Sequence, residues 1–433
     1  MIPRYSMADM DWIWSEENQY IQWINVEIAA LKALGRGGII PDINIPFIDI
    51  LHKDTHLLTI GQNPEKRIRI DIDNFIKDCK EDERTTTHDV ASCVNVLERR
   101  IGIDIGKYLH YGMTGSDLVD TALALRIKES NTLIHNSLLH LQNTLHMSAH
   151  KHKDVCIMGR THGKYAEPIS LGLVFGLYVA EFGRHIERMD EITKRIYVGK
   201  MSGSVGSYVH INPGTERIFL EILRLSQPKI TNQIIQRDRH AELFNLYALI
   251  GTTLEKLATQ IRHYSRSEVN EMAEGHGKGY TGSSSMPHKK NPIGSENICG
   301  LARMLRGYAA TALENNSLWH ERDLSHSCTE RFLFPDASGI LYHMLSKMKN
   351  IIMTLYINTE GMTKKVEDNI DMWSSQYRML KLIDGGASRR EAHTKVQNNE
   401  DLNEDDTHYL IPGNKEPLIK YFLRHTNIIL SKL

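Results

Sequence analysis

The stretch "AELFNLYALIGTTLEKLATQIRHY", Ala241 to Tyr264, has the apolar spacing of a long amphipathic helix. Its leucines and isoleucines recur at steps of three and four residues, which places them on one helical face. Similar patterns predict four further helices: one soon after Asp117, one after Pro168, one from about Glu296 to Leu313 and one after Pro335. Five long helices joined by short loops favour an all-α fold built on a helical bundle.

The scarcity of proline supports this interpretation, because proline breaks helix interiors. None falls between Pro64 and Pro168 or between Pro228 and Pro287. We therefore expect a central long-helix bundle over residues 113–356, flanked by two smaller, mainly helical domains over residues 1–112 and 357–433. Helices this long on a nearly neutral chain often pair with copies of themselves.

Composition excludes several classes of protein. The 433 residues are 41% hydrophobic and 24% charged, with a formal net charge of −1, which offers no general attraction to nucleic acid or to acidic membranes. The five cysteines are scattered without a CxxC pair or metal-ligand spacing, as expected of reduced thiols in a cytoplasmic protein. No apolar run reaches the roughly 20 residues that span a bilayer. We expect no metal, nucleic-acid or membrane partner.

The irregular segment "GKGYTGSSSMPHKKNPIGSEN", Gly277 to Asn297, lies between two helical patterns. Clusters of glycine, serine and proline are usually plain connectors. Here, however, "MPHKKNP" places lysines, a histidine and an asparagine next to three serines. A flexible, cationic segment rich in hydroxyls suits a lid over an anionic substrate.

Within this segment, "GSSSMPHKKNP", Gly282 to Pro292, resembles the signature GSSxMPxKxNP of the fumarase/aspartase superfamily, with every fixed position present. The resemblance implies long-helix bundles assembled as homotetramers, with active sites shared between subunits, that cleave C–N or C–O bonds to release fumarate. We expect no cofactor. The resemblance also implies that Ser283 is the base that removes a carbon-bound proton. Lys289 and Asn291 belong to the same motif.

Other blocks resemble the adenylosuccinate lyase family: "IPRY", "TTTHDV", "MGRTHGKYAEP", "TNQIIQRDRHAE" and "LWHERDLSHSCTER". The resemblance covers nearly the whole chain and fades toward its C-terminal end. It implies cleavage of adenylosuccinate, an anionic nucleotide, to AMP and fumarate, and generally also cleavage of succinyl-aminoimidazole carboxamide ribotide. The implied substrate contacts are Arg4, Tyr5, Thr87, Asp89, Thr114, Gln233, Asn291, Arg322, Ser327 and Arg331.

The proton donor is assigned by the same resemblance. Histidine holds and releases a proton near neutral pH, and the "GRTH" context points to His162 as the general acid. His88 is the competing candidate. Glu296 either pairs with His162 and keeps it protonated or is an ordinary first-turn acid at a helix N-terminus. Ser283 is a weak base as a neutral hydroxyl, so it needs cations such as Lys289 to stabilise an alkoxide.

Two positions depart from the family pattern: Gly115 stands where serine is common, and Thr87 where many relatives have a basic residue. Arg322 and Arg331 are nine residues apart, which would point them to opposite sides of an unbroken helix. If both contact one substrate, "RDLSHS" should contain a turn. The alternatives are a sister enzyme, such as a carboxymuconate cycloisomerase, and an inactive helical scaffold.

Overall fold

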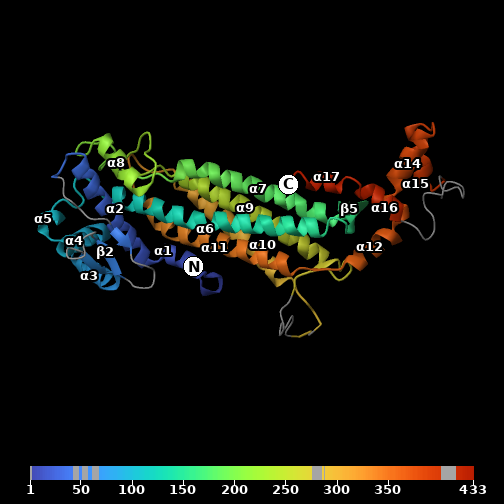
Figure 1. Ribbon diagram of the computed structural model, residues 1–433, viewed down its shortest axis with the longest axis horizontal. Coiled ribbons are helices and arrows are strands. Elements are labelled where there is room, and N and C mark those ends of the chain that lie inside the picture. The colour runs from blue at the N-terminus through green and yellow to red at the C-terminus, as the bar shows by residue number, and fades with distance from the viewer. Residues whose placement is uncertain are drawn as a thin grey trace. The chain divides into compact units, whose positions relative to one another are not determined.

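The computed structural model describes residues 2–41, 48–50, 57–60, 68–275, 285–286, 288–400 and 416–433. Helices dominate these residues, which confirms the all-α prediction (Figure 1). The five predicted long helices are all present: α6 Gly115–Lys151, α7 Leu171–Ile196, α9 Asp238–Tyr264, α10 Ile293–Glu314 and α11 Ser325–Thr354.

Shorter elements precede, follow and connect the long helices. On the N-terminal side are η1 Pro3–Tyr5, α1 Ala8–Trp14, α2 Glu16–Arg36, α3 Ile72–Thr86, α4 Asp89–Ile101 and α5 Ile103–Gly106, with the antiparallel sheet β1 Ile48–Ile50, β2 Leu57–Ile60 and β3 Ile68–Asp71. Between the long helices are β4 Cys156–Thr161, β5 Lys164–Ser170, α8 Pro213–Leu223 and β6 Met272–Ala273. After them come β7 Tyr356–Ile357, α12 Thr359–Asp368, α13 Ile370–Trp373, α14 Ser375–Asp384, α15 Arg389–Gln397, α16 Glu416–Leu423 and α17 Thr426–Leu430.

The chain divides into two compact units. The first comprises Met1–Ser137, Ile186–Gly251 and Leu301–Met344, and the second comprises Leu138–His185, Thr252–Gly300 and Leu345–Leu433. Each of the five long helices contributes residues to both units. The division into three consecutive domains at residues 112 and 356 stays a prediction.

The first unit is built around α2. Ser15 caps this helix by accepting a hydrogen bond from the Asn18 backbone at 3.1 Å. Most α2 residues from Tyr20 to Leu34 are buried. The helix contacts α3, α4 and α8, and α3 packs on α4 (Figure 1). A helix buried on several faces needs apolar residues beyond a single stripe, and "YIQWINVEIAAL" has them.

In the second unit, β4 and β5 form an antiparallel hairpin that α12, α13 and α16 cover. A small apolar cluster joins these elements: Cys156, Met158, Val366, Trp373 and Leu418. The Trp373 indole N–H donates to the Val366 carbonyl at 2.7 Å, so the buried ring leaves no polar atom unsatisfied. The hairpin is therefore held in place by apolar packing against these three helices.

The helix predicted after Pro168 is present as α7, but Pro168 itself is not part of it. Pro168 lies in β5, opposite Met158 of β4, and the helix begins three residues later at Leu171. In a two-stranded sheet, the outer edge of each strand pairs with no other strand. A proline whose missing N–H would point to that edge therefore removes no hydrogen bond between the strands. Proline after "GKYAE" therefore marks an edge strand here.

The predicted start of α11 after Pro335 is wrong. The helix begins at Ser325, and Pro335 lies inside it. Asp323 explains the earlier start, because its carboxylate accepts from the Ser325 backbone N–H at 2.7 Å and also from the Ser325 hydroxyl. A proline within a helix removes a single intrahelical bond, and in a helix of 30 residues packing outweighs that loss.

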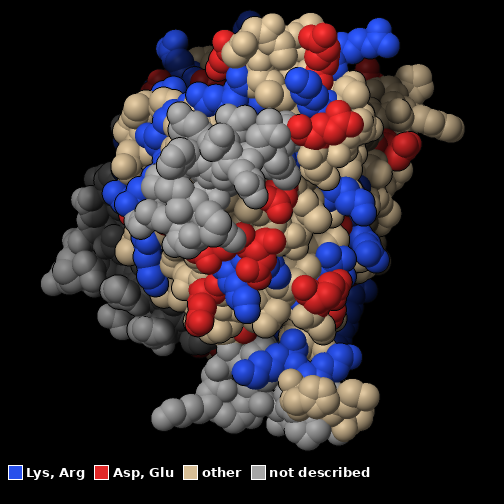
Figure 2. Space-filling model, turned by 90° about the vertical axis from the view of Figure 1, so that its right-hand side faces the viewer, with Lys and Arg blue, Asp and Glu red and all other residues tan. Residues whose placement is uncertain are grey.

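One face of the molecule carries both signs of charge. Figure 2 shows lysine and arginine interspersed with aspartate and glutamate on the face that it presents. None of the described helices combines the length and the apolar composition that crossing a membrane requires.

Replacing Ile24 by alanine is expected to lower the free energy of unfolding by about 2 to 5 kcal/mol, because its fully buried side chain would leave a cavity. Ile103→Ala is the matched control, since Ile103 is 65% exposed, and it should change stability by less than about 0.5 kcal/mol. Urea unfolding followed by circular dichroism measures both. Equal losses would contradict the central place of α2 in the core.

Candidate active site

The predicted site residues fall in both units, and each unit is described by itself. The first unit holds Arg4, Tyr5, Thr87, His88, Asp89, Thr114, Gln233, Arg322, Ser327 and Arg331. The second holds His162, Ser283, Lys289, Asn291 and Glu296. Of these, Ser283 lies outside the described residues.

His162 occupies the tip of the β4–β5 hairpin. Thr161 pairs with Lys164, which leaves His162 and Gly163 as a two-residue loop with φ values of 54° and 73°. Positive φ at both positions is the requirement of a type I′ turn. Glycine meets it at no cost, whereas an imidazole-bearing residue is strained there. The side chain of His162 is exposed. The hairpin thus presents the predicted acid at an exposed turn.

A buried ion pair anchors this hairpin. Arg160 of β4 donates two hydrogen bonds to Glu271, at 2.9 and 2.5 Å, and Lys365 of α12 adds a third cationic contact at 3.3 Å. The Glu271 side chain is fully buried. The Arg160 guanidinium also lies over the rings of Tyr165 and Tyr264. Arg160 lies in the quoted "GRTH" block, two residues before His162, but nothing in the sequence indicates Glu271 as its partner.

Glu274 binds the backbone at the start of α10. Its carboxylate accepts from the backbone N–H groups of Gly294 and Ser295, at 3.0 and 2.5 Å, and from the Ser295 hydroxyl at 2.6 Å. These N–H groups belong to the first turn of α10, where a carboxylate is favoured. Residues 274 and 294 are therefore adjacent in space, so the intervening stretch starts and ends at one place.

The other predicted residues of the signature segment lie near the start of α10. Lys289 and Glu296 are exposed, Asn291 is half-buried, and Glu296 stands in the first helical turn. Within this single chain no ion pair joins Glu296 to His162, both of which are described. Their pairing stays a prediction, and the first-turn position fits the simpler interpretation of Glu296.

His88 and Thr87 form the junction between α3 and α4. His88 is the N-cap of α4, and its Nδ1 accepts from the Ala91 N–H at 3.4 Å. Thr87 ends α3 with φ of 53°, a strained conformation for a β-branched residue. Asp89 follows in the first turn of α4, with a carboxylate oxygen 3.6 Å from His88 Nδ1. The imidazole of His88 is exposed.

Gly115 lies beside His88. A Cβ atom built on Gly115 would be 4.0 Å from His88 Cε1 and 4.0 Å from Val90 Cγ2, which is ordinary contact distance. The structure therefore brings the "TGSD" block and the "THDV" block together. The Cβ atom of the serine common in the family therefore meets no clash at residue 115.

Asp117, in the first turn of α6, organises the predicted contact Thr114. Its carboxylate accepts from the backbone N–H of Thr114 at 2.9 Å, of Ser202 at 3.0 Å and of Gly203 at 3.1 Å. It also pairs with the ammonium of Lys200, and neither side chain is exposed to solvent. A buried ion pair of this kind is stable when hydrogen bonds satisfy it on every side. Sequence reasoning missed both residues.

The predicted contacts Gln233 and Arg322 meet in the structure. The Arg322 guanidinium donates to the Gln233 amide oxygen at 3.2 Å, across 89 residues of sequence. Arg322 Nε is buried and without a hydrogen-bond partner among the described residues. Arg322 precedes α11, whereas Ser327 and Arg331 lie within it, so the turn predicted in "RDLSHS" is present.

Arg4 and Tyr5 are placed by the short helix η1. The Tyr5 ring packs edge-on against His343 of α11 at a centroid distance of 5.2 Å, while Arg4 is exposed. Both are in the same unit as Arg322. The exposed guanidinium is free of the desolvation cost that a buried charge would carry before a ligand arrives.

A buried charge network that sequence reasoning also missed lies close to Gln233. Arg237 bonds to Asp120 of α6 and to Glu330 of α11, and His240 Nδ1 lies 3.3 Å from Glu330. Burial alone would raise the pKa of Glu330, but Arg237 and the neighbouring histidines lower it to about 2. Burial and the charge of Arg237 lower the pKa of His326.

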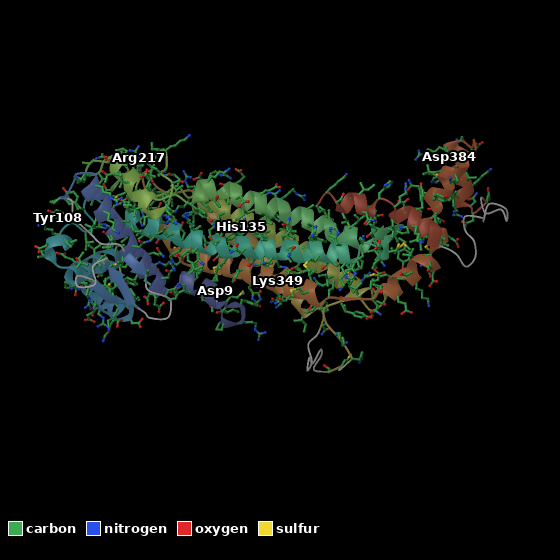
Figure 3. All side chains as sticks on the ribbon, in the orientation of Figure 1. Asp9, Tyr108, His135, Arg217, Lys349 and Asp384 are labelled. Atoms are coloured by element: carbon green, nitrogen blue, oxygen red, sulfur yellow. The ribbon has the colours of Figure 1, made fainter. Side chains whose placement is uncertain are left out.

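A more exposed pair also joins two long helices of this unit. His135 on α6, labelled in Figure 3, has its Nε2 atom 3.0 Å from a carboxylate oxygen of Asp190 on α7. The Asp190 side chain is 65% exposed. Water screens such a pair, so it contributes little compared with the buried network.

Among the described residues, no group of three or more histidine, cysteine, aspartate or glutamate side chains is arranged to hold a metal ion. The predicted site residues carry imidazole, guanidinium, ammonium, hydroxyl, amide and carboxyl groups. They suit proton transfer and the binding of phosphate and carboxylate groups.

Comparison with known proteins places the chain in a class of enzymes. Residues 59–307 match the model of a family described as lyase. Solved structures with the same fold include a fumarate lyase from Mesorhizobium sp. BNC1 (TM-score 0.76, 22% identity, covering 100% of this chain and 96% of that one). Another is the 3-carboxy-cis,cis-muconate lactonizing enzyme from Pseudomonas putida (TM-score 0.79, 21% identity, covering 99% and 96%). The chain therefore has the same fold as these two enzymes.

Closer relatives narrow the family. The adenylosuccinate lyase of Bacillus subtilis is 40% identical over 397 residues, which is 92% of this chain and 87% of that protein. The adenylosuccinate lyase of Deinococcus radiodurans is 40% identical over 400 residues, which is 92% of this chain and 88% of that protein. The chain belongs to the adenylosuccinate lyase family of C–N lyases.

Acidification is expected to remove the stability that Glu330 contributes. Its pKa falls from an ordinary 4.5 to about 2 on folding, so this contribution is complete above pH 4.5 and is lost as the pH falls toward 2. The shift corresponds to about 3 kcal/mol. Urea unfolding at several pH values should show Glu330→Gln losing less stability than the wild type between about pH 5 and pH 3. Parallel curves would contradict this assignment.

Proposed function

We propose that this chain cleaves adenylosuccinate to AMP and fumarate by β-elimination, as a step of purine nucleotide biosynthesis. The observation that carries the proposal is the 40% identity to an adenylosuccinate lyase across 92% of the chain. By the same reasoning, the chain also cleaves succinyl-aminoimidazole carboxamide ribotide, which carries the same succinyl group on a nitrogen.

The division of catalytic roles follows the order of bond changes. Ser283, as an alkoxide, removes a proton from the carbon adjacent to the one that bears the leaving nitrogen, and Lys289 stabilises the charge on the serine oxygen. His162 then protonates the departing nitrogen, a role that suits an imidazole at neutral pH. The exposed hairpin tip supports this role, because the side chain is held on a rigid turn yet remains accessible. His88, the alternative donor, orients the substrate or stabilises charge.

Substrate binding is assigned to the polar residues of the first unit and to Asn291. Adenylosuccinate carries a phosphate and two carboxylates, and guanidinium groups bind such anions with paired hydrogen bonds. The contact between Arg322 and Gln233 supports a shared role for these two side chains. Ser327 and Arg331 follow on α11, and Thr114 lies near His88 through Gly115.

The finer proposals concern the setting of the enzyme. We propose a homotetramer in which subunits share active sites, acting in the cytoplasm without a cofactor and without a nucleic-acid partner. The mixed charges on the face shown in Figure 2 support the last point, because a polyanion would be drawn to a surface of one sign.

The test is to mix the purified protein with adenylosuccinate and to follow AMP and fumarate by absorbance and chromatography. Rapid turnover without added metal supports the proposal. No turnover by a folded, tetrameric protein would contradict it, and carboxymuconate and argininosuccinate would then separate a sister lyase from an inactive scaffold.

Replacing Ser283 by alanine is expected to reduce kcat by at least about 1000-fold while folding and assembly stay intact, because the base is lost. Ser285→Ala, two residues away in the same segment, is the matched control and should keep most of the activity. Steady-state kinetics with adenylosuccinate, together with size-exclusion chromatography, measure both effects. An active Ser283→Ala variant would show that another group is the base.

A further inference from the structure

The guanidinium of Arg237 uses all five of its N–H groups inside the first unit. Two go to Asp120, at 2.8 and 2.9 Å, and two go to Glu330, at 2.9 and 3.1 Å. The fifth goes to the carbonyl of Ile235 at 2.6 Å. The side chain is 2% exposed. Arginine alone among the side chains offers this many donors in a rigid, permanently charged fork.

One arm of this network fixes the backbone that carries Gln233. The Ile235 carbonyl bonds to Arg237, and the Ile235 N–H donates to Asp120 at 2.9 Å. The backbone N–H of Ile235 is therefore held by Asp120 and its backbone carbonyl by Arg237. Gln233 is two residues earlier in a segment that is neither helix nor strand, so these bonds replace the support that regular structure would give.

The other arm fixes the start of α11. Glu330 lies one turn after His326, whose Nδ1 atom is 3.5 Å from its carboxylate, and directly before Arg331. Ser327 lies in the same turn, and Arg322 precedes it in the adjoining bend. If Glu330 moved, Ser327 and Arg331 on the same helix would move with it, away from Gln233.

We propose that Arg237 is a positioning residue of the substrate site, which holds the Gln233 segment and the start of α11 in the register that lets Gln233 and Arg322 bind one substrate together. Arg237 acts through other residues and does not itself touch the substrate. The kinetic part of this inference rests on the proposed function, whereas the coupling between the two segments does not.

Hydrogen–deuterium exchange on the Arg237→Lys variant tests the coupling without any substrate. Lysine keeps the charge between the two buried carboxylates, so the fold is preserved, but its three donors cannot make five directed bonds. Amide exchange should accelerate at least about tenfold in residues 232–236 and 324–331. Unchanged exchange in both segments would overturn the proposal.

Arg126→Lys is the matched control, because Arg126 is also buried and in the same unit, at 9% exposure. Its guanidinium donates to the carbonyls of Ile13 and Ser15, away from Gln233. Exchange in this variant should accelerate near residues 13–19 and stay unchanged in residues 232–236. Acceleration of both regions in both variants would indicate general loosening and would also overturn the proposal.

Steady-state kinetics give the second readout. With adenylosuccinate, Arg237→Lys should raise KM at least about tenfold with a kcat change below about threefold. Displacing Gln233 and Arg322 weakens the binding of the substrate and of the transition state by the same amount. Arg126→Lys should leave KM unchanged. An unchanged KM in Arg237→Lys overturns the proposal. A wild-type protein inactive on adenylosuccinate contradicts the proposed function instead, and the exchange result still decides whether Arg237 couples the two segments.

Discussion

A buried carboxylate must be paired with cations or hydrogen-bond donors, and the loops of this structure depend on this requirement. Asp117 shows it in its simplest form: with no exposure to water, its two oxygens meet the Lys200 ammonium and three backbone N–H groups. A buried carboxylate left without such partners would cost several kcal/mol. The loop around Ser202 is therefore tied to α6 by the need to compensate one charge, although apolar packing dominates the helices themselves.

Related arrangements occur at other predicted site segments that lie outside the helices. The buried Glu271 holds the hairpin of the second unit through Arg160, and the half-buried Glu274 accepts hydrogen bonds from the backbone at the start of α10. In the first unit, Arg237 is shared between two carboxylates. Each carboxylate supports residues next to a proposed catalytic or binding group without being that group itself. Geometry that must be kept precise is thus carried by polar contacts, which are directional, and not by apolar contacts, which are not.

The sequence predicts the helices better than it predicts these supports. Apolar spacing locates all five long helices, because a periodic stripe is a property of each segment alone. The start predicted after Pro335 is wrong, because the hydrogen bonds of Asp323 begin α11 earlier, and the pairing of Pro168 in β5 delays the start of α7 to Leu171. Motif resemblance placed Gln233 and Arg322, which the structure joins. It could not reveal Glu271 or Glu330, since a lone carboxylate carries no sign of its partner until distant segments meet.

The turn at His162 has a consequence for how such a chain responds to selection. A two-residue loop with positive φ at both positions favours asparagine followed by glycine, so histidine at the first position costs conformational energy. Selection for thermal stability alone would then replace His162 by asparagine and strengthen the hairpin while removing the imidazole. A chain selected for its chemistry would keep histidine at residue 162, whereas a chain selected only for its fold would lose it.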